Sequence, residues 1–215
     1  MQSAADRQGG KVRILPVRKG GVDGYDLAVR SGDATVADYL VALDKALRML
    51  PLTRTRNPEG RCQGCAACCA ERIPLTSIDF WQLTRRCDPG AGLLAPIADV
   101  TTDGRSVDIV LKRNDQGRCV FFDSGKGLCR VYRARPLVCR TFICCPVSTR
   151  ASELRGALTN AGEDELVRLW LAQESPPSGV TREDWRTGAF TGHWSYREVK
   201  LRDCVSPGLW RRLYQ

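Results

Sequence analysis

Apolar residues recur along the chain at two spacings, which predict where strands and helices lie. Residues 12–17 and 25–30 read as two short strands, and the glycine-rich residues 19–24 between them predict a turn. In residues 36–50 the apolar side chains recur at alternating four- and three-residue steps, which is the period of one helix face. The first fifty residues therefore predict two strands followed by an amphipathic helix.

The middle of the chain combines a short helix with alternating strands. Thr76 and Asp79 resemble a capping box, in which each side chain binds the other's backbone amide, so a helix is expected at about residues 77–86. Residues 88–105, with proline and glycine, predict a loop. Alternating residues and intervening turns then predict a three-stranded antiparallel meander at residues 106–113, 119–122 and 128–132.

The last third of the chain predicts helices. Arg135-Pro136 opens a short helical segment, because proline suits the first helical turn. Residues 151–173 and 196–204 are expected to be helical, and Ser206-Pro207 to start a last short helix. We therefore expect an α+β protein in which a small antiparallel meander and short helices hold a cysteine-rich metal centre, with flanking helices. Its expected parts are an N-terminal strand–helix segment (1–59), a cysteine-cluster metal-binding domain (60–150) and a helical C-terminal extension packing on it (151–215).

Composition decides how the cysteines are interpreted. No apolar run is long enough to span a membrane, and the N-terminus lacks the apolar stretch of a secretory signal, so the expected compartment is the cytoplasm. Disulfides rarely persist there, so the 11 cysteines are more readily metal ligands or redox groups. The formal net charge of +9 permits contact with nucleic acid or an acidic partner without demanding either.

Four cysteines lie within eight residues, and their spacing indicates a metal site. Each two-residue gap lets the chain bend back so that both sulfurs reach one ion, as in zinc knuckles and ferredoxin loops. The alternative is that these thiols pack as small hydrophobes, but a segment flanked by Arg61 and Arg72 cannot bury itself as a core without a staple. The segment is Cys62-Gln-Gly-Cys65-Ala-Ala-Cys68-Cys69.

A second group of cysteines lies on the predicted meander. Cys119 and Cys129 are equally far from a turn centred near Ser124. A symmetric hairpin would place them opposite each other, with Cβ atoms roughly 5 Å apart. That geometry could hold one metal between two strands.

A third group follows the predicted short helix. Cys139 lies about one helical turn beyond its proline. Cys144 and Cys145 are adjacent, and adjacent residues on a strand point apart, so only one of them is expected to be a ligand, and we assign Cys145. The isolated Cys87 and Cys204 are expected to be core or surface thiols.

Arginines crowd the last cysteines. A multi-thiolate centre is anionic, and guanidinium groups beside it would compensate its charge and could tune a reduction potential. The alternative is a solvated basic face, since exposed arginines are common. Arg135 and Arg140 are the candidates for contact with a cofactor, among Arg130, Arg133, Arg135 and Arg140.

At these residues the chain resembles the CxxCxxCC cysteine-cluster family, the YkgJ-type domains that chelate zinc or iron. The matching pieces span about residues 60–146 and occur in the same order: the four-cysteine segment, Ile73-Pro-Leu-Thr76 with Asp79, Cys119-Val-Phe-Phe122, Cys129-Arg-Val-Tyr132, Arg135-Pro136 and Cys139-Arg140. The resemblance implies a metal centre formed or surrounded by Cys62, Cys65, Cys68, Cys69, Cys119, Cys129 and Cys139. Flagellin lysine methylases carry a similar domain and look like iron–sulfur proteins.

All-sulfur ligation suits both zinc and iron–sulfur clusters. The single histidine, His193, is distant in sequence, so no histidine is expected among the ligands. The absence of a histidine ligand and the run of two-residue gaps favour an iron–sulfur cluster such as 4Fe-4S over zinc. The candidates exceed the four ligands that one site needs, so either two sites exist or one site has spare thiols. The predicted ligands are Cys62, Cys65, Cys68, Cys69, Cys119, Cys129, Cys139 and Cys145.

Two other function classes are compatible with parts of the sequence. A zinc-stabilised module could bind nucleic acid or a protein partner, since aromatics between cations can stack bases. We favour the interpretation that the C-terminal stretch is an amphipathic closing segment whose aromatic side chains face inward. The sequence leaves an enzymatic function open, although it contains no recognisable catalytic triad, phosphate loop or dinucleotide fingerprint. The C-terminal stretch contains Trp194, Tyr196, Arg197, Lys200, Arg202, Trp210, Arg211, Arg212 and Tyr214.

Overall fold

The computed structural model describes residues 10–57, 65–85, 94, 96–103, 106–173 and 186–215. Both helices and small antiparallel sheets are present, so the expected α+β class is confirmed. The elements are β1 (Val12–Lys19), β2 (Val22–Val29), α1 (Val36–Met49), α2 (Ser77–Thr84), β3 (Ala98–Thr102), β4 (Val107–Leu111), β5 (Phe122–Asp123), β6 (Leu128–Cys129), α3 (Leu137–Thr141), α4 (Thr149–Gln173) and α5 (Pro207–Leu213), with 3-10 turns at Ala67–Ala70, Tyr132–Ala134 and Leu201–Cys204.

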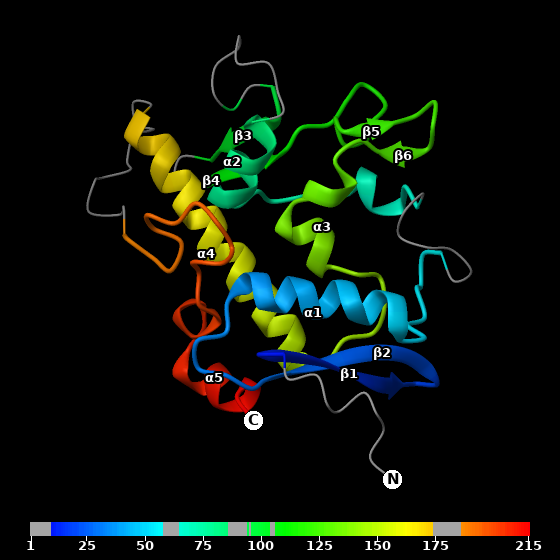
Figure 1. The fold of residues 1–215 in the computed structure, drawn as a ribbon. Coiled ribbons are helices and arrows are strands. Elements are labelled where there is room, and N and C mark those ends of the chain that lie inside the picture. Colours follow the sequence, from blue (N-terminus) through cyan, green and yellow to red (C-terminus); the bar gives the residue numbers. More distant parts are fainter. Residues whose placement is uncertain (1–9, 58–64, 86–93, 95, 104–105, 174–185) are drawn as a thin grey trace.

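The strands β1 and β2 form a hairpin against which α1 packs (Figure 1). Gly20 and Gly21 make its two-residue turn at φ 59° and 80°, a left-handed conformation that glycine adopts without a steric cost. A capping box starts α1: the Thr35 side chain accepts from the Asp38 amide at 3.2 Å, and the Asp38 carboxylate accepts from the Thr35 amide at 2.8 Å. The predicted strands, turn and helix are confirmed.

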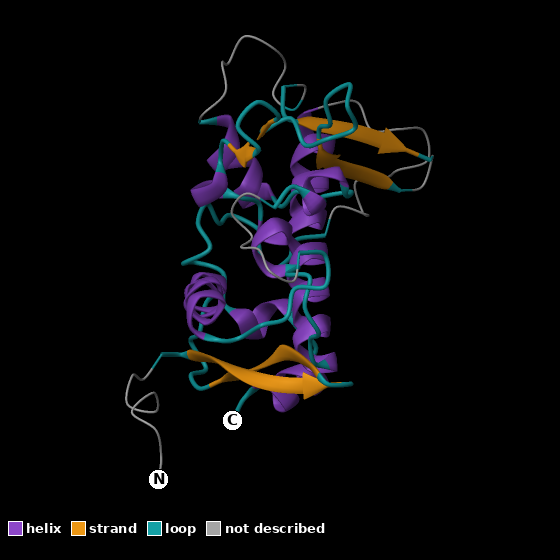
Figure 2. Cartoon of the chain, turned by 90° about the vertical axis from the view of Figure 1, so that its right-hand side faces the viewer, coloured by secondary structure: helices purple, strands orange, loops and turns teal. Residues whose placement is uncertain are grey.

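Helix α4 joins the two ends of the molecule. It contacts β2 at one end and α2 and β4 at the other. Figure 2 shows the β1–β2 hairpin and the β3–β4 sheet at opposite ends, with α4 running between them. The helix therefore contributes Leu154 and Leu158 to one hydrophobic core and Leu166 to another.

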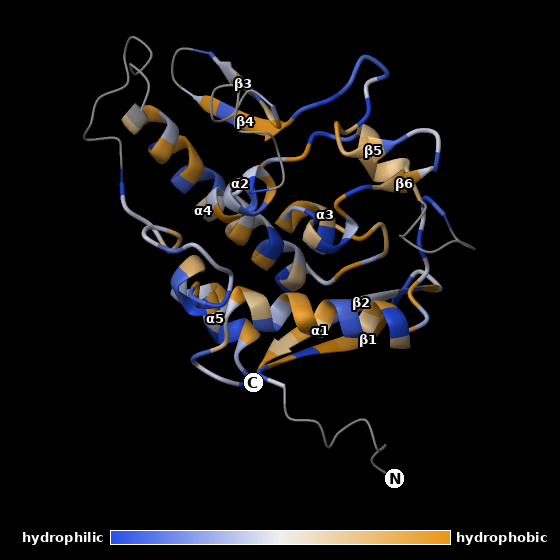
Figure 3. Cartoon of the chain, turned by 45° about the horizontal axis from the view of Figure 1, so that its top comes forward, coloured by the Kyte–Doolittle hydropathy of each residue, from blue (hydrophilic) through white to orange (hydrophobic). Residues whose placement is uncertain are grey.

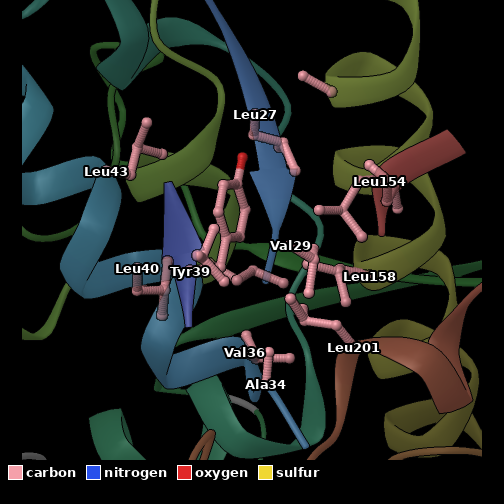
Figure 4. Packing of buried hydrophobic residues seen from close by; sticks show 14 of the residues in the cluster. Leu27, Val29, Ala34, Val36, Tyr39, Leu40, Leu43, Leu154, Leu158 and Leu201 are labelled. Carbon is pink, nitrogen blue, oxygen red and sulfur yellow. The ribbon is translucent and has the colours of Figure 1, made fainter. Parts of the chain in front are cut away.

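The first core gathers side chains from β2, α1, α4 and the C-terminal segment (Figure 4). Figure 3 shows hydrophobic residues in orange on α1 and on the hairpin. The second core lies around α2 and the β3–β4 sheet. Its buried residues are Ile73, Leu75, Phe80, Leu83, Ile97, Ala98, Ile109, Leu111, Cys119, Phe121, Val131 and Leu166.

The predicted three-stranded meander differs from the structure. Strand β4 pairs with β3, which falls inside the expected loop at 88–105, and β5 pairs with β6 in a separate sheet. The expected pairing of Cys119 with Cys129 is wrong, because Cys129 lies opposite Phe122. The physical reason is the turn: Asp123 Oδ1 accepts from the amides of residues 125 and 126, which centres the hairpin later in the chain.

The predicted helix at 196–204 is also wrong for most of its length, since only Leu201–Cys204 forms a 3-10 turn. The carbonyls of Tyr196 and Val199 instead accept from the amides of Ala37 and Val36, both at 2.9 Å. The first amides of a helix have no acceptor inside that helix. The carbonyls of this C-terminal segment therefore accept the hydrogen bonds of the first amides of α1. The other predicted helices are confirmed by α2, α3, α4 and α5.

Candidate metal centre

A pocket of about 80 Å³ lies between the two cores. Leu47 and Ile143 line it from the side of the first core, and Ile73, Leu111 and Val131 from the second. Its described lining contains no Asp, Glu or His, so the available ligands are soft sulfur atoms. Seven described cysteines line the pocket: Cys65, Cys68, Cys69, Cys119, Cys129, Cys139 and Cys144.

Four of these cysteines belong to the second core, and we call them the inner thiols: Cys69, Cys119, Cys129 and Cys139. Cys119 is 7% exposed, and the other three pack against the same core. They come from separate segments, namely a 3-10 turn, the β5–β6 region and α3. The fold therefore brings together four predicted ligands that lie up to 70 residues apart in sequence.

Burial raises the pKa of three inner thiols, Cys69, Cys119 and Cys139. It raises the pKa of Cys69 to about 11, with neighbouring Cys119 and Cys129 adding to the effect. Burial likewise raises the pKa of Cys119, and that of Cys139 well above its ordinary value. Thiols in such surroundings stay protonated at neutral pH until a metal displaces the proton.

Backbone hydrogen bonds hold the first cysteine segment against the strand region. The Cys119 amide donates to the carbonyl of Cys69 at 2.6 Å, and the Phe121 amide donates to the Cys119 sulfur at 3.4 Å. The guanidinium of Arg118 donates to the carbonyl of Ala66 at 3.3 Å. These contacts place Cys69 and Cys119 side by side on one wall of the pocket.

Asp79 positions the helix that carries Cys139. Its carboxylate accepts from the Leu137 amide at 2.9 Å, the Tyr196 hydroxyl at 2.6 Å and the Thr76 amide at 3.1 Å. Burial raises the pKa of Asp79 to about 6 despite these hydrogen bonds. One buried carboxylate thus ties the start of α2, the start of α3 and the C-terminal segment together.

The adjacent cysteines at 144 and 145 point apart, as expected, but the one that lines the pocket is Cys144. Cys145 is 7% exposed and lies in the first core, so the structure does not bring it to the other predicted ligands. Cys204 packs against the first core, in line with its expected role. Cys62 and Cys87 lie outside the described residues.

Among the described residues, no three His, Cys, Asp or Glu side chains are gathered closely enough to hold a single metal ion. The model of one protein family, described as "Putative zinc- or iron-chelating domain", matches residues 61–160. Cys65, Cys68 and Cys69 fit its motif. Residues 61–160 are therefore similar to a CxxCxxCC domain. Comparisons with curated proteins and with solved structures gave no match.

Two predicted arginines line the same pocket. Arg140 is paired with Asp44 of α1 at 2.6 Å. The guanidinium of Arg135 lies 4.0 Å from the centroid of the Tyr132 ring, and its Nε donates to the carbonyl of that residue at 3.0 Å. Arg54 lines the pocket as well, from outside the matched residues. Sequence spacing gave no signal for Arg54, because the fold alone brings it to the cysteines.

The aromatic and basic C-terminal stretch lies outside the residues that the family model matches. Tyr196 is buried at 5% exposure, where it donates to Asp79 and cannot stack on a base. Trp194 is exposed and lies 4.7 Å from the ring of Trp81, and Arg212 is paired with Glu153. No helix of the described residues is both long enough and apolar enough to cross a membrane.

Proposed function

We propose that the chain binds an iron–sulfur cluster through the inner thiols and uses it for electron transfer or metal handling. The observation that carries this proposal is the convergence of Cys69, Cys119, Cys129 and Cys139 from separate segments onto one apolar pocket. Four thiolates are the usual ligand set of a cluster. The family description supports chelation of zinc or iron and leaves the choice between them open.

The size and chemistry of the pocket favour a cluster over a single zinc ion. About 10–15 Å³ suffices for one water molecule, so a pocket of about 80 Å³ has room for several atoms. A single zinc ion requires its four sulfurs at about 2.3 Å from one point. Inner thiols that surround a larger space suit a group in which each sulfur binds a different iron atom.

A bound cluster would supply one-electron redox chemistry. The chain's own residues would hold it, shield it and offset its charge. Ile73, Leu111 and Val131 form apolar walls that would limit the contact of the cluster with water. Arg135 and Arg140 bring positive charge to the same pocket, which would oppose the negative charge of four thiolates.

Metal analysis of anaerobically purified protein, expressed with ample iron, tests this proposal. We expect brown protein with iron, acid-labile sulfide and charge-transfer absorption in the visible range. Cys139→Ser should lose most of the iron, whereas the matched control Cys204→Ser, which alters a half-buried thiol away from the pocket, should keep it. Colourless protein with stoichiometric zinc would contradict the cluster and support a zinc-stabilised binding module.

A further inference from the structure

One arginine beside the second core faces two carboxyl groups that come from different elements. Arg72 follows the four-cysteine segment, Asp108 lies on β4 and Glu163 lies on α4. The Arg72 guanidinium donates to both carboxylate oxygens of Asp108, from Nε at 2.9 Å and from Nη2. The same Nη2 lies 3.7 Å from Oε1 of Glu163. These three side chains therefore connect α4 to β4 and to the chain that leaves the cysteine segment.

This cluster has one positive charge for two negative charges when both of its carboxyl groups are ionised. In the described part of the chain, neither Asp108 nor Glu163 pairs with a second cation. The Glu163 side chain is 18% exposed and that of Asp108 is 30% exposed, so water screens them only in part. Like charges held close together with little solvent disfavour ionisation of both groups, and a shared proton relieves the repulsion.

The surroundings of Glu163 favour its protonated form near neutral pH. Burial raises the pKa of Glu163 to about 7, and the hydrogen bond and charge of Asp108 raise it as well. The charge of Arg72 opposes this shift, and that of the neighbouring Asp164 adds to it. Helix α2 also packs on α4, but its Asp79 carboxylate binds the start of α3 instead. The charge imbalance of the cluster therefore lies between α4, β4 and the segment at residue 72.

We propose that Arg72, Asp108 and Glu163 form a proton-controlled clamp that fastens α4 to the second core. When Glu163 is protonated, its carboxyl group donates to the carboxylate of Asp108, which accepts from Arg72, and the charges balance. Loss of that proton to solvent leaves two carboxylates facing one guanidinium, and their repulsion loosens α4 from β4. The clamp does not depend on a bound cluster, because none of its side chains lines the pocket.

The direction of the pH dependence follows from the exchange of this proton. The pKa of Glu163 is higher in the folded chain than its ordinary value of 4.5. The stability that it contributes is therefore fully present below about pH 4.5 and is lost as the pH rises through about 7. Glu163→Gln keeps a hydrogen-bond donor toward Asp108 and cannot ionise, so this variant should be more stable than wild type above pH 7. A simple salt bridge to Arg72 predicts the opposite, because glutamine would remove an attraction.

Urea unfolding of wild type and Glu163→Gln between pH 5.5 and 8.5, on anaerobically purified protein, tests the clamp. The two midpoints should coincide at pH 5.5, and that of Glu163→Gln should be higher by about 1 M urea at pH 8.5. The matched control is Glu153→Gln, because Glu153 lies on the same helix and pairs with the exposed Arg212. Its midpoint should stay parallel to that of wild type across the pH range.

Carbon-13 NMR of the carboxyl groups gives a second readout that does not rely on the folding of a variant. The Glu163 carboxyl of wild type should titrate near pH 7, and Asp108→Asn should move this titration toward 4.5. A Glu163 carboxyl that titrates below pH 5.5 in wild type overturns the clamp, as does a Glu163→Gln variant that is less stable than wild type at pH 8.5. Failure of the proposed cluster is distinct, because it appears as wild-type protein without iron and leaves these pH profiles unchanged.

Discussion

The two hydrophobic cores differ in what holds them together. In the described part of the chain the first core has 23 buried residues and the second has 12. The first is closed by aliphatic and aromatic packing, whereas all four inner thiols lie in or against the second. Small cores rarely stabilise themselves without a staple such as a metal. The first core should therefore fold by burial alone, and the second should depend on its metal centre.

Removal of the metal is the change with the largest expected effect on this difference. Binding free energies of structural metal sites are on the order of 10 kcal/mol, which exceeds what twelve buried residues leave after the entropy cost of folding. Anaerobic chelation should expose the amides of residues 107–131 to hydrogen exchange, while those of residues 22–49 stay protected. Equal loss of protection in both regions would show that the cores are one cooperative unit.

The converse change acts on the first core. Leu154 is fully buried there, so Leu154→Ala should lower the free energy of unfolding by about 3 kcal/mol. Metal content per folded chain should stay unchanged, because the inner thiols lie in or against the second core. Val41→Ala, on the exposed face of α1 at 66% exposure, is the control and should change stability little.

Much of the fold follows from local signals, and the exceptions are tertiary. The box of Thr76 and Asp79 predicts α2 correctly, because both partners lie within four residues. The expected helix at 196–204 fails because its carbonyls satisfy the distant N-terminus of α1. The β3 strand was missed because its partner β4 supplies the pairing that residues 98–102 do not signal themselves.

The metal centre likewise has a part that follows from local sequence and a part that follows only from the tertiary fold. The spacing of the four-cysteine segment predicts metal ligands, and the place of Cys139 after a helix-opening proline predicts another. Nothing in sequence distinguishes Cys144 from its neighbour. In the structure the carbonyl of Cys144 accepts a hydrogen bond from Thr55, 89 residues away in sequence, and Cys144 lines the pocket. Cys145 lies among the buried side chains of the first core.

Two glycines of α4 allow a test of how closely this helix packs against α2, which belongs to the other end of the molecule. A Cβ at Gly162 would lie 2.5 Å from Cγ2 of Thr76, the residue that caps α2, whereas a Cβ at Gly156 would meet nothing within 4 Å. Gly162→Ala should therefore cost about 2 kcal/mol in thermal or denaturant unfolding. Gly156→Ala should add up to about 1 kcal/mol from helix propensity alone. Equal effects in both variants would mean that α4 does not press on α2.

The smallest expected effect concerns an ion pair at the edge of the first core. Asp26 accepts two hydrogen bonds from Arg150, at 2.6 and 2.8 Å, and both side chains are less than one-fifth exposed. Burial by itself raises the pKa of Asp26, but the hydrogen bonds from Arg150, Ser148 and the Leu27 amide outweigh it and lower the pKa. Asp26→Asn should cost about 1.5 kcal/mol at neutral pH.

The pH dependence of that cost distinguishes a buried pair from an exposed one. A carboxyl whose pKa is lower in the folded state stabilises the fold above its unfolded pKa of about 4, and this contribution is lost as the pH falls through the folded value. Wild type and Asp26→Asn should therefore converge in stability in acid. Lys11 and Asp33 form an equally short but exposed pair, so Asp33→Asn should change stability little, and salt should abolish what remains. If salt reduces the contribution of Asp26 as much as that of Asp33, the Asp26–Arg150 pair is exposed to solvent, because only burial protects an ion pair from screening.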